Sequence, residues 1–369
     1  MKPLSAIIAT LIIPVLLLHV GCGTESESED VISVEISTHW IPVTTSEVRE
    51  INAIAYGDSG PTDADFEWSS SNPSVATVSG GNIYPSSPGT TIVAATADGF
   101  TTDPCTVHVA EDWIIYAGNS GLRIISPDNN RDMPIKGTSE AAGPILWTNT
   151  GIYYNTPALW GYSYLWFRAF NSDSAWMVTA DTLDEIHDIR LNPDGGYFVA
   201  SYPNIYALDA NRGLPGIADY LYIHDDSVYY EDMDISPNND GFVARVSRMG
   251  YSTRLLIFDM DGNPEDTIAL VGVNCPRFNP TGTKVAYGYS ARIYIADLTT
   301  NPISIGYYIS EGEGIRGLSW SGDGGEIAMC VLNSVSDYEL WIGNPGTGET
   351  NRLTNAQSSS EYYFPQWID

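Results

Sequence analysis

Short runs of alternating apolar and polar residues recur along the chain from residue 31 onward. A period of two over about four to eight residues predicts a β-strand, because successive side chains of a strand point to opposite faces of the sheet. In the clearest stretch the runs are separated by turn sequences, of which Asp323-Gly324 is typical of a hairpin. The strands predicted there are 317–320, 326–332, 338–342 and 350–354. Because the same order recurs in other stretches, we expect an all-β protein.

One short segment recurs at a spacing of 42 to 47 residues, and each copy starts with an apolar residue that we call the lead residue. The lead residues are Trp147, Leu191, Ile235, Phe278, Trp320 and Trp367. A period in the low forties with several short strands per repeat is typical of a β-propeller. The last copy stops after its first strand, whereas 113–118 is a strand with no such strand before it. We therefore predict that 361–367 pairs with 113–118 and closes a ring of six blades.

Several copies also carry a recognisable family pattern. The segments that match it best are Phe364-Pro365-Gln366-Trp367, Pro276-Arg277-Phe278-Asn279-Pro280 and Trp320-Ser321-Gly322-Asp323-Gly324. They resemble the Pro-x-Trp-Ser-Pro-Asp-Gly segment of TolB-type, WD40-like propellers, and the resemblance covers residues 111–369. It implies a six-bladed β-propeller. It says little about function, since this fold hosts binding, scaffolding and a few catalytic roles.

Residues 31–110 form a second unit of short predicted strands separated by Gly, Pro and Ser turns, which is typical of a β-sandwich. The segments 68–78 and 88–96 resemble the group 2 bacterial Ig-like domain. That resemblance implies a spacer or adhesion module, and no catalytic residues accompany it.

The N-terminus has the pattern of a processing segment. Lys2 precedes an apolar run at 6–18, which is too short to span a membrane and has the length of a signal-peptide core. Residues 1–21 are therefore a predicted signal peptide. Val20-Gly21-Cys22 resembles a bacterial lipobox, although His19 departs from the usual pattern. The resemblance implies lipidation of Cys22 and a polar tether over 22–30; an ordinary signal peptide with an incidental cysteine is the alternative.

The net charge of −30 opposes binding to nucleic acid or to anionic lipid headgroups. Four cysteines in 369 residues do not make a disulfide framework. We expect Cys105, Cys275 and Cys330 to be free thiols, with a bridge between the last two as the alternative.

The sequence contains little that supports catalysis. There is no His-x-x-His, Cys-x-x-Cys or Gly-x-Ser-x-Gly, so a transition-metal site or a nucleophile elbow lacks its residues. The acidic segment 259–266 suggests Ca²⁺, but it lacks the EF-hand register and serves equally well as a hairpin turn. We predict no cofactor, with Ca²⁺ as the alternative.

Two features point to a binding face of the predicted propeller. Trp160 and Tyr162 lie at the tip of a long loop, 155–163, where burial is least expected. Acidic residues gather on connections between repeats that we expect on the same face. The acidic candidates for ligand contacts are Asp184, Glu185, Asp225, Asp226, Glu311 and Glu313. Aromatic rings folded over the channel and a solvated acidic rim are the alternatives.

These patterns predict an extracytoplasmic, lipid-anchored protein of the outer membrane or cell surface, or else a periplasmic or secreted one. We expect a monomer that binds an envelope or extracellular protein or a carbohydrate, and no nucleic acid, and that contacts membrane through its lipid alone. A propeller enzyme acting on polysaccharide and a purely structural surface or adhesion component are the two alternative functions. What lines the channel distinguishes them.

Overall fold

A computed structural model of the chain describes most residues from 30 to 368. The described ranges are 30–118, 120–128, 131–157, 163–178, 186–191, 197–201, 204–208, 221–223, 228–248, 251–269, 272–301, 303–310, 314–333, 337–354 and 363–368. Within them every regular element is a β-strand. No helix in these ranges is long and apolar enough to cross a membrane.

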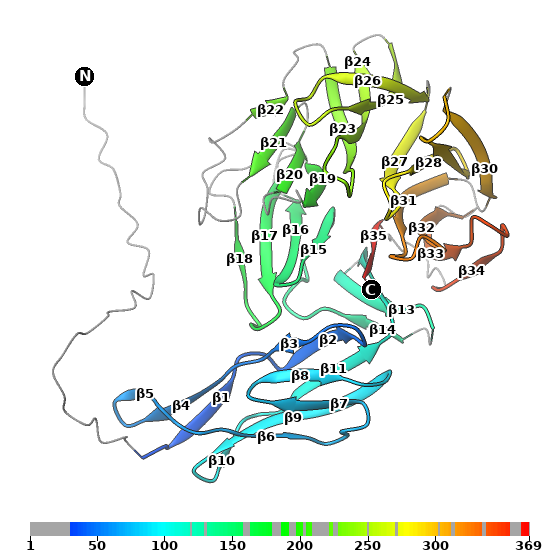
Figure 1. The fold of residues 1–369 in the computed structure, drawn as a ribbon. Helices are drawn as coiled ribbons and strands as arrows, with labels where there is room; N and C mark the ends of the chain where they lie inside the picture. Colours follow the sequence, from blue (N-terminus) through cyan, green and yellow to red (C-terminus); the bar gives the residue numbers. More distant parts are fainter. Residues whose placement is uncertain are drawn as a thin grey trace, which may run out of the picture.

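The N-terminal unit is built from three small sheets (blue to cyan in Figure 1). Its strands are β1 (Ser33–Ile36), β2 (Trp40–Thr44), β3 (Arg49–Glu50), β4 (Ala53–Gly57), β5 (Gly60–Thr62), β6 (Glu67–Ser70), β7 (Ala76–Ser79), β8 (Asn82–Pro85), β9 (Gly89–Ala97), β10 (Phe100–Thr101) and β11 (Cys105–Ala110). The sheets have the orders β1-β4-β5, β3-β8-β7 and β10-β9-β11-β2, and β6 pairs with β9.

Burial explains which of these strands could be predicted. In β9, Thr91, Val93 and Ala95 are buried and alternate with more exposed residues, which is the pattern that identifies a half-buried strand. Strand β2 is buried at every position and pairs in parallel with β11. A strand covered on both faces has no alternation, and for this reason the sequence did not reveal it.

The described parts of 113–368 form six four-stranded antiparallel sheets arranged around a common centre, as in a β-propeller (Figure 1). The first strands are β12 (Trp113–Gly118), β13 (Gly121–Ser126), β14 (Arg131–Pro134), β15 (Ile145–Trp147), β16 (Gly151–Pro157), β17 (Ser163–Ala169), β18 (Ala175–Met177), β19 (Ile186–Leu191), β20 (Tyr197–Ser201), β21 (Asn204–Leu208) and β22 (Leu221–Ile223). The remaining strands are β23 (Val228–Ile235), β24 (Phe242–Arg248), β25 (Tyr251–Phe258), β26 (Pro264–Ala269), β27 (Val273–Phe278), β28 (Lys284–Tyr289), β29 (Arg292–Asp297), β30 (Ser304–Ser310), β31 (Gly314–Trp320), β32 (Ile327–Leu332), β33 (Tyr338–Gly343), β34 (Thr350–Arg352) and β35 (Tyr363–Ile368).

The two ends of this region meet in one sheet, whose order is β14-β13-β12-β35. Strand β35 pairs antiparallel with β12, and Trp367 lies opposite Ile114. The neighbouring strand β31 approaches β35 so closely that a Cβ on Gly317 would lie 2.5 Å from Pro365 Cδ. Only glycine fits there, because that separation is shorter than real Cβ contacts. The last strand therefore joins the first sheet to the sheet of β31.

The N-terminal unit packs directly against the propeller. One buried apolar cluster includes Val43 and Val109 from the first unit and Trp113 and Ile368 from the second. The indole Nε1 of Trp113 donates to the carbonyl of Val43 at 2.9 Å. The Arg49 guanidinium stacks over the ring of Phe170, with 3.8 Å from its Cζ to the ring centroid. The two units consequently share a continuous core.

A histidine at this junction predicts acid sensitivity. His108 on β11 lies 3.1 Å from Thr90 Oγ1, and Arg131 of β14 donates to the carbonyl of Gly89 at 2.9 Å. Burial, and secondarily the positive charge of Arg131, lower the pKa of His108 from 6.5 to about 4. As the pH falls from 6.5 to 4, the unfolded chain binds a proton that the folded chain refuses, so the unfolding free energy should fall.

The expected loss is at most about 3 kcal/mol, since one pH unit between the two pKa values is worth about 1.4 kcal/mol. Urea unfolding at pH 7 and at pH 4.5 measures it for the wild type and for His108→Gln. The variant should lose less stability on acidification than the wild type. Equal losses would show that His108 does not carry the effect.

Candidate functional site

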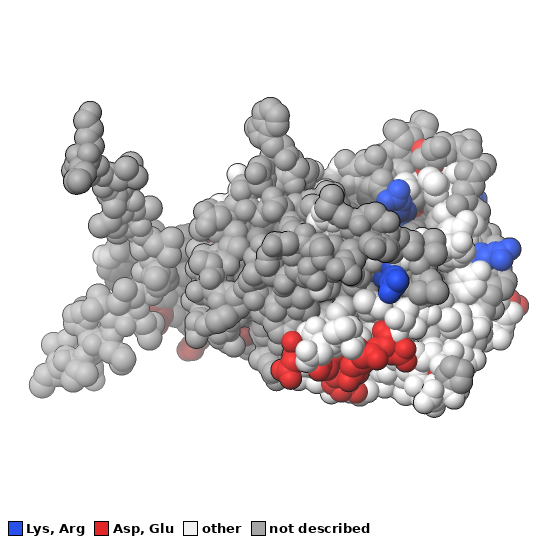
Figure 2. Space-filling model, turned by 90° about the horizontal axis from the view of Figure 1, so that it is seen from above, with Lys and Arg blue, Asp and Glu red and all other residues white. Residues whose placement is uncertain are grey.

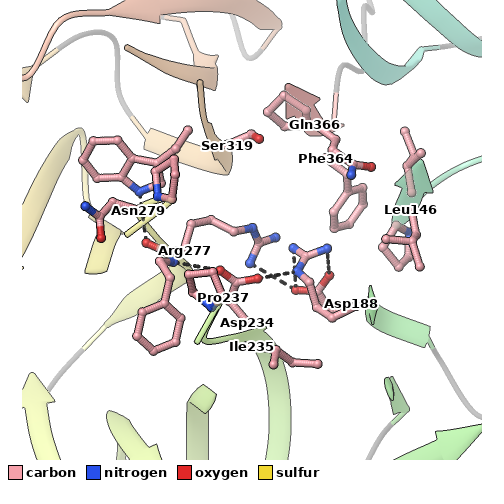
Figure 3. Close-up of a pocket in the computed structure, with 17 residues that line it drawn as sticks. Leu146, Asp188, Asp234, Ile235, Pro237, Arg277, Asn279, Ser319, Phe364 and Gln366 are labelled. Carbon is pink, nitrogen blue, oxygen red and sulfur yellow. Dashed lines mark hydrogen bonds and ion pairs between the residues drawn. The ribbon is translucent and has the colours of Figure 1, made fainter. Parts of the chain in front are cut away.

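The innermost strands of the sheets, β15, β19, β23, β27, β31 and β35, each bring the residue just before the lead residue to the central channel, and some bring further side chains, such as Asp188 of β19. In order around the ring, the residues before the lead residues are Leu146, Arg190, Asp234, Arg277, Ser319 and Gln366. All six line one cavity of about 220 Å³ (Figure 3). The sequence repeat thus becomes a ring of side chains, which we call the channel ring.

The innermost strands contain β-bulges near the channel. The pairing register shifts in the sheets of β19, β23, β27, β31 and β35. At two of these bulges a residue with left-handed backbone precedes a proline: Cys275 has φ 50° and Phe364 has φ 54°. Left-handed backbone costs a non-glycine residue on the order of 1 kcal/mol or more, so the surrounding packing must hold it. Bulges of this kind redirect the side chains that follow.

One half of the channel ring is a closed network of charges, centred on the fully buried Asp188. Its Oδ1 lies 2.9 Å from Nη1 of Arg190, and its Oδ2 lies 3.2 Å from Nη1 of Arg277. Nε of Arg190 lies 3.0 Å from Oδ1 of Asp234. Two arginines and two aspartates balance, so this half of the ring carries no net charge.

The pKa values reflect the competition between burial and pairing. Burial raises the pKa of Asp234, although Arg190 and Arg277 act to lower it. Burial also lowers the pKa of Arg190. Burial acts to lower the pKa of Arg277 as well, but the carboxylates of Asp188 and Asp234 outweigh it and raise that pKa. Each ion is held in place by its partners rather than by solvent.

Several ring side chains also tie one sheet to the next. Asp234 Oδ2 accepts from the backbone N–H of Phe278 at 2.7 Å. Ser319 Oγ accepts from Trp367 N at 2.8 Å, and Gln366 Oε1 accepts from Trp147 N at 2.6 Å. In each bond the donor is the lead residue of the following repeat. Residues that line the channel therefore also form hydrogen bonds between neighbouring sheets.

The binding residues predicted from the sequence lie outside the described residues. They are Trp160, Tyr162, Asp184, Glu185, Asp225, Asp226, Glu311 and Glu313, and the lipidation candidate Cys22 is outside them too. The acidic segment at 259–266 is described in part as a turn: Asp259 Oδ1 accepts from the backbone N–H groups of Asp261 and Asn263. Across the described ranges, no group of three or more His, Cys, Asp or Glu side chains is placed to hold a metal ion. Cys105, Cys275 and Cys330 are free and buried.

Sequence reasoning missed the channel ring, although a signal for it was present. The ring residue is the variable position of the Pro-x-Trp pattern, as in Pro365-Gln366-Trp367 and Pro276-Arg277-Phe278. A proline inside a strand is confined to edges and bulges, and so it also marked where these strands bend. Aligning the six lead residues and reading one position upstream would have found the ring.

Comparison with known proteins identifies the fold and leaves the family open. No protein-family model matches the chain, and no curated protein matches it in sequence. Among solved structures, TolB from Acinetobacter baumannii has a TM-score of 0.54 at 14% identity, over 77% of this chain and 80% of that one. A protein from Agrobacterium tumefaciens assigned as a TolB has 0.52 at 14%, over 70% and 98%. A chain of the nidogen–laminin complex has 0.56 at 8%, over 70% and 98%. The chain therefore contains a β-propeller similar in fold to those of these proteins.

Proposed function

We propose that this chain is a non-enzymatic binding protein of the bacterial cell envelope. One observation carries the proposal: the carboxylates of the channel, Asp188 and Asp234, are both engaged by arginines and by backbone N–H groups. A general acid or base needs a carboxyl or imidazole that is free to exchange a proton with a substrate. Groups that hold one another in place are suited to keeping a site rigid.

The proposed architecture has four parts. Residues 1–21 are the signal peptide, and 22–30 are the lipidated Cys22 and its tether. Residues 31–110 are an Ig-like β-sandwich of the group 2 bacterial type, and 111–369 are a six-bladed propeller. The continuous core at their junction supports a spacer that holds the propeller in a set orientation on the cell surface.

The partner is proposed to dock on the propeller face that carries the loop 155–163 and the acidic connections between repeats. In a propeller, loops from several repeats converge around one axis on such a face, and contacts can accumulate in a concave mouth. The described surface in Figure 2 has acidic side chains gathered along one side and isolated basic ones elsewhere, in keeping with the net charge of −30. A net charge of this sign favours an envelope or extracellular protein, or a carbohydrate, over any polyanion.

The test is capture by the immobilised full mature chain from solubilised envelope extract, followed by binding measurements with the purified partner. Trp160→Ala and Tyr162→Ala should each weaken that binding by about 1–2 kcal/mol, at an unchanged melting temperature. Tyr84→Ala, which removes an aromatic ring that is 43% exposed on β8 of the N-terminal unit, is the matched control. Turnover of a polysaccharide that a substitution in the channel abolishes would instead support an enzyme.

The anchor is tested separately. Cys22→Ser should move the protein from the membrane fraction to the soluble fraction without altering its melting temperature, because the proposed tether contributes nothing to the core. Mass spectrometry of the mature N-terminus should find an acylated Cys22 in the wild type. An unmodified N-terminus at another residue would contradict the anchor and leave the binding proposal standing.

A further inference from the structure

The channel ring has the chemistry of a ligand site as well as that of a scaffold. Resting on the binding role proposed above, we propose that the channel binds a small organic monocarboxylate, whose carboxylate is held by Arg277, Ser319 and Gln366. These three residues are consecutive members of the ring and line the same cavity (Figure 3).

The first step is a surplus of hydrogen-bond donors. Arg277 donates through Nη1 to the carbonyls of Met233 and Pro276, and its Nε and Nη2 make no hydrogen bond to any described residue. The amide oxygen of Gln366 is used, whereas its NH₂ group donates to no described residue. The hydroxyl proton of Ser319 is likewise donated to no described residue. Donors that line a cavity without a protein acceptor are open to a ligand that accepts hydrogen bonds.

The second step is a shortage of acceptors. Both oxygens of Asp188 are occupied: Oδ1 accepts from Ile189 N at 3.0 Å, and Oδ2 accepts from Met233 N at 3.3 Å and from Nη2 of Arg190 at 3.2 Å. Asp234 is occupied by Phe278 N and Arg190. A ligand that supplies acceptors therefore complements this part of the cavity. The planar edge formed by Nε and Nη2 of a guanidinium matches two oxygens of one carboxylate.

The third step concerns the rest of the ligand. The charges of the network already balance, and the chain as a whole carries −30, so a singly charged anion is favoured over a multiply charged one. The cavity lining also includes the aromatic residues Phe278, Trp320 and Phe364, on the same three strands as the donors. Aromatic lining and a volume of about 220 Å³ suit a compact apolar body attached to the carboxylate.

The experiment is isothermal titration of the full mature chain with sodium benzoate, sodium phenylacetate and sodium hexanoate at constant ionic strength. Benzamide, which is the neutral isostere of benzoate, is the ligand control. At least one carboxylate should bind with a Kd below about 1 mM, and benzamide should bind at least tenfold more weakly. Failure of all three carboxylates would overturn the inference.

Gln366→Glu is the decisive variant. Its carboxylate still accepts from Trp147 N, but it replaces the free NH₂ donor by a negative charge, and binding should weaken at least tenfold. Asn351→Asp adds the same charge on the outer strand β34, where Asn351 is exposed, and should bind like the wild type. Arg277→Lys keeps the positive charge and loses the planar fork, and it should also weaken binding at least tenfold.

The outcomes separate this inference from the function it rests on. Carboxylate binding that Gln366→Glu and Arg277→Lys leave unchanged would place the ligand elsewhere and overturn the inference. Capture of a purified envelope partner without any carboxylate binding would do the same and leave the proposed function intact. Carboxylate binding without an envelope partner would retain the channel site and remove the role on the cell surface.

Discussion

Replacing Trp367 by alanine is expected to destabilise the propeller by about 3–5 kcal/mol, which is the cost of truncating a buried tryptophan. Trp367 is 8% exposed and packs between the sheet of β12 and β13 and the sheet of β32 and β33. Its loss would leave a cavity at the seam where the chain closes on itself. For a domain of this size the melting temperature should fall by roughly 6–20 °C.

Thermal unfolding followed by circular dichroism measures this effect. Trp176→Ala is the control, because Trp176 is 44% exposed on the outer strand β18 and should cost no more than about 1 kcal/mol. Similar losses for both variants would mean that the closing strand contributes no more than any surface strand. Deleting residues 363–369 should have a larger effect than Trp367→Ala, since it also exposes the edge of β12.

Asp188→Asn is expected to cost a similar amount, about 3–5 kcal/mol, for a different reason. The substitution preserves shape but leaves two buried guanidinium groups, Arg190 and Arg277, with Asp234 as the remaining counter-charge among the described network. Breaking one partner of a buried pair strands the other charge away from water, and that desolvation dominates the loss.

Urea unfolding at neutral pH measures the cost, with Asp266→Asn as the control. Asp266 lies exposed on β26 and accepts from the N–H of its neighbour Thr267, so its substitution should change stability by less than about 0.5 kcal/mol. The combination of Asp188→Asn with Arg190→Met should be less destabilising than the sum of the single changes, because the two residues share one network. Strict additivity would contradict the network.

The first prediction reflects a difference between neighbouring positions of a repeat. The lead residue Trp367 fills the space between sheets, whereas Gln366 before it lines the channel. Packing therefore constrains the first position, and the second can vary in chemistry from leucine to arginine. A propeller of this kind can change what its channel binds with little change to its core.

The sequence indicated the repeat period, the order of strands within a repeat, and that the repeat containing β12 lacks its first strand at the N-terminal end. They are local properties: alternation identifies a strand, and Asp-Gly identifies a turn, whatever lies elsewhere in the chain. The three free thiols were predicted as well, and Cys105, Cys275 and Cys330 are free and buried. Strand β2, covered on both faces, was not predicted, since burial on both sides removes the alternation.

The sequence by itself determined an all-β chain with a repeating unit and two differently patterned parts. The tertiary structure alone decided that six residues spaced along 146–366 become one ring, that Asp188 lies between two arginines, and that the N-terminal unit shares its core with the propeller. The physical reason is that the repeat period gives the spacing of strands along the chain, but not how close together the sheets lie around the common centre. Where bulges turn the innermost strands, side chains that are about 44 residues apart become neighbours, and no local pattern encodes that encounter.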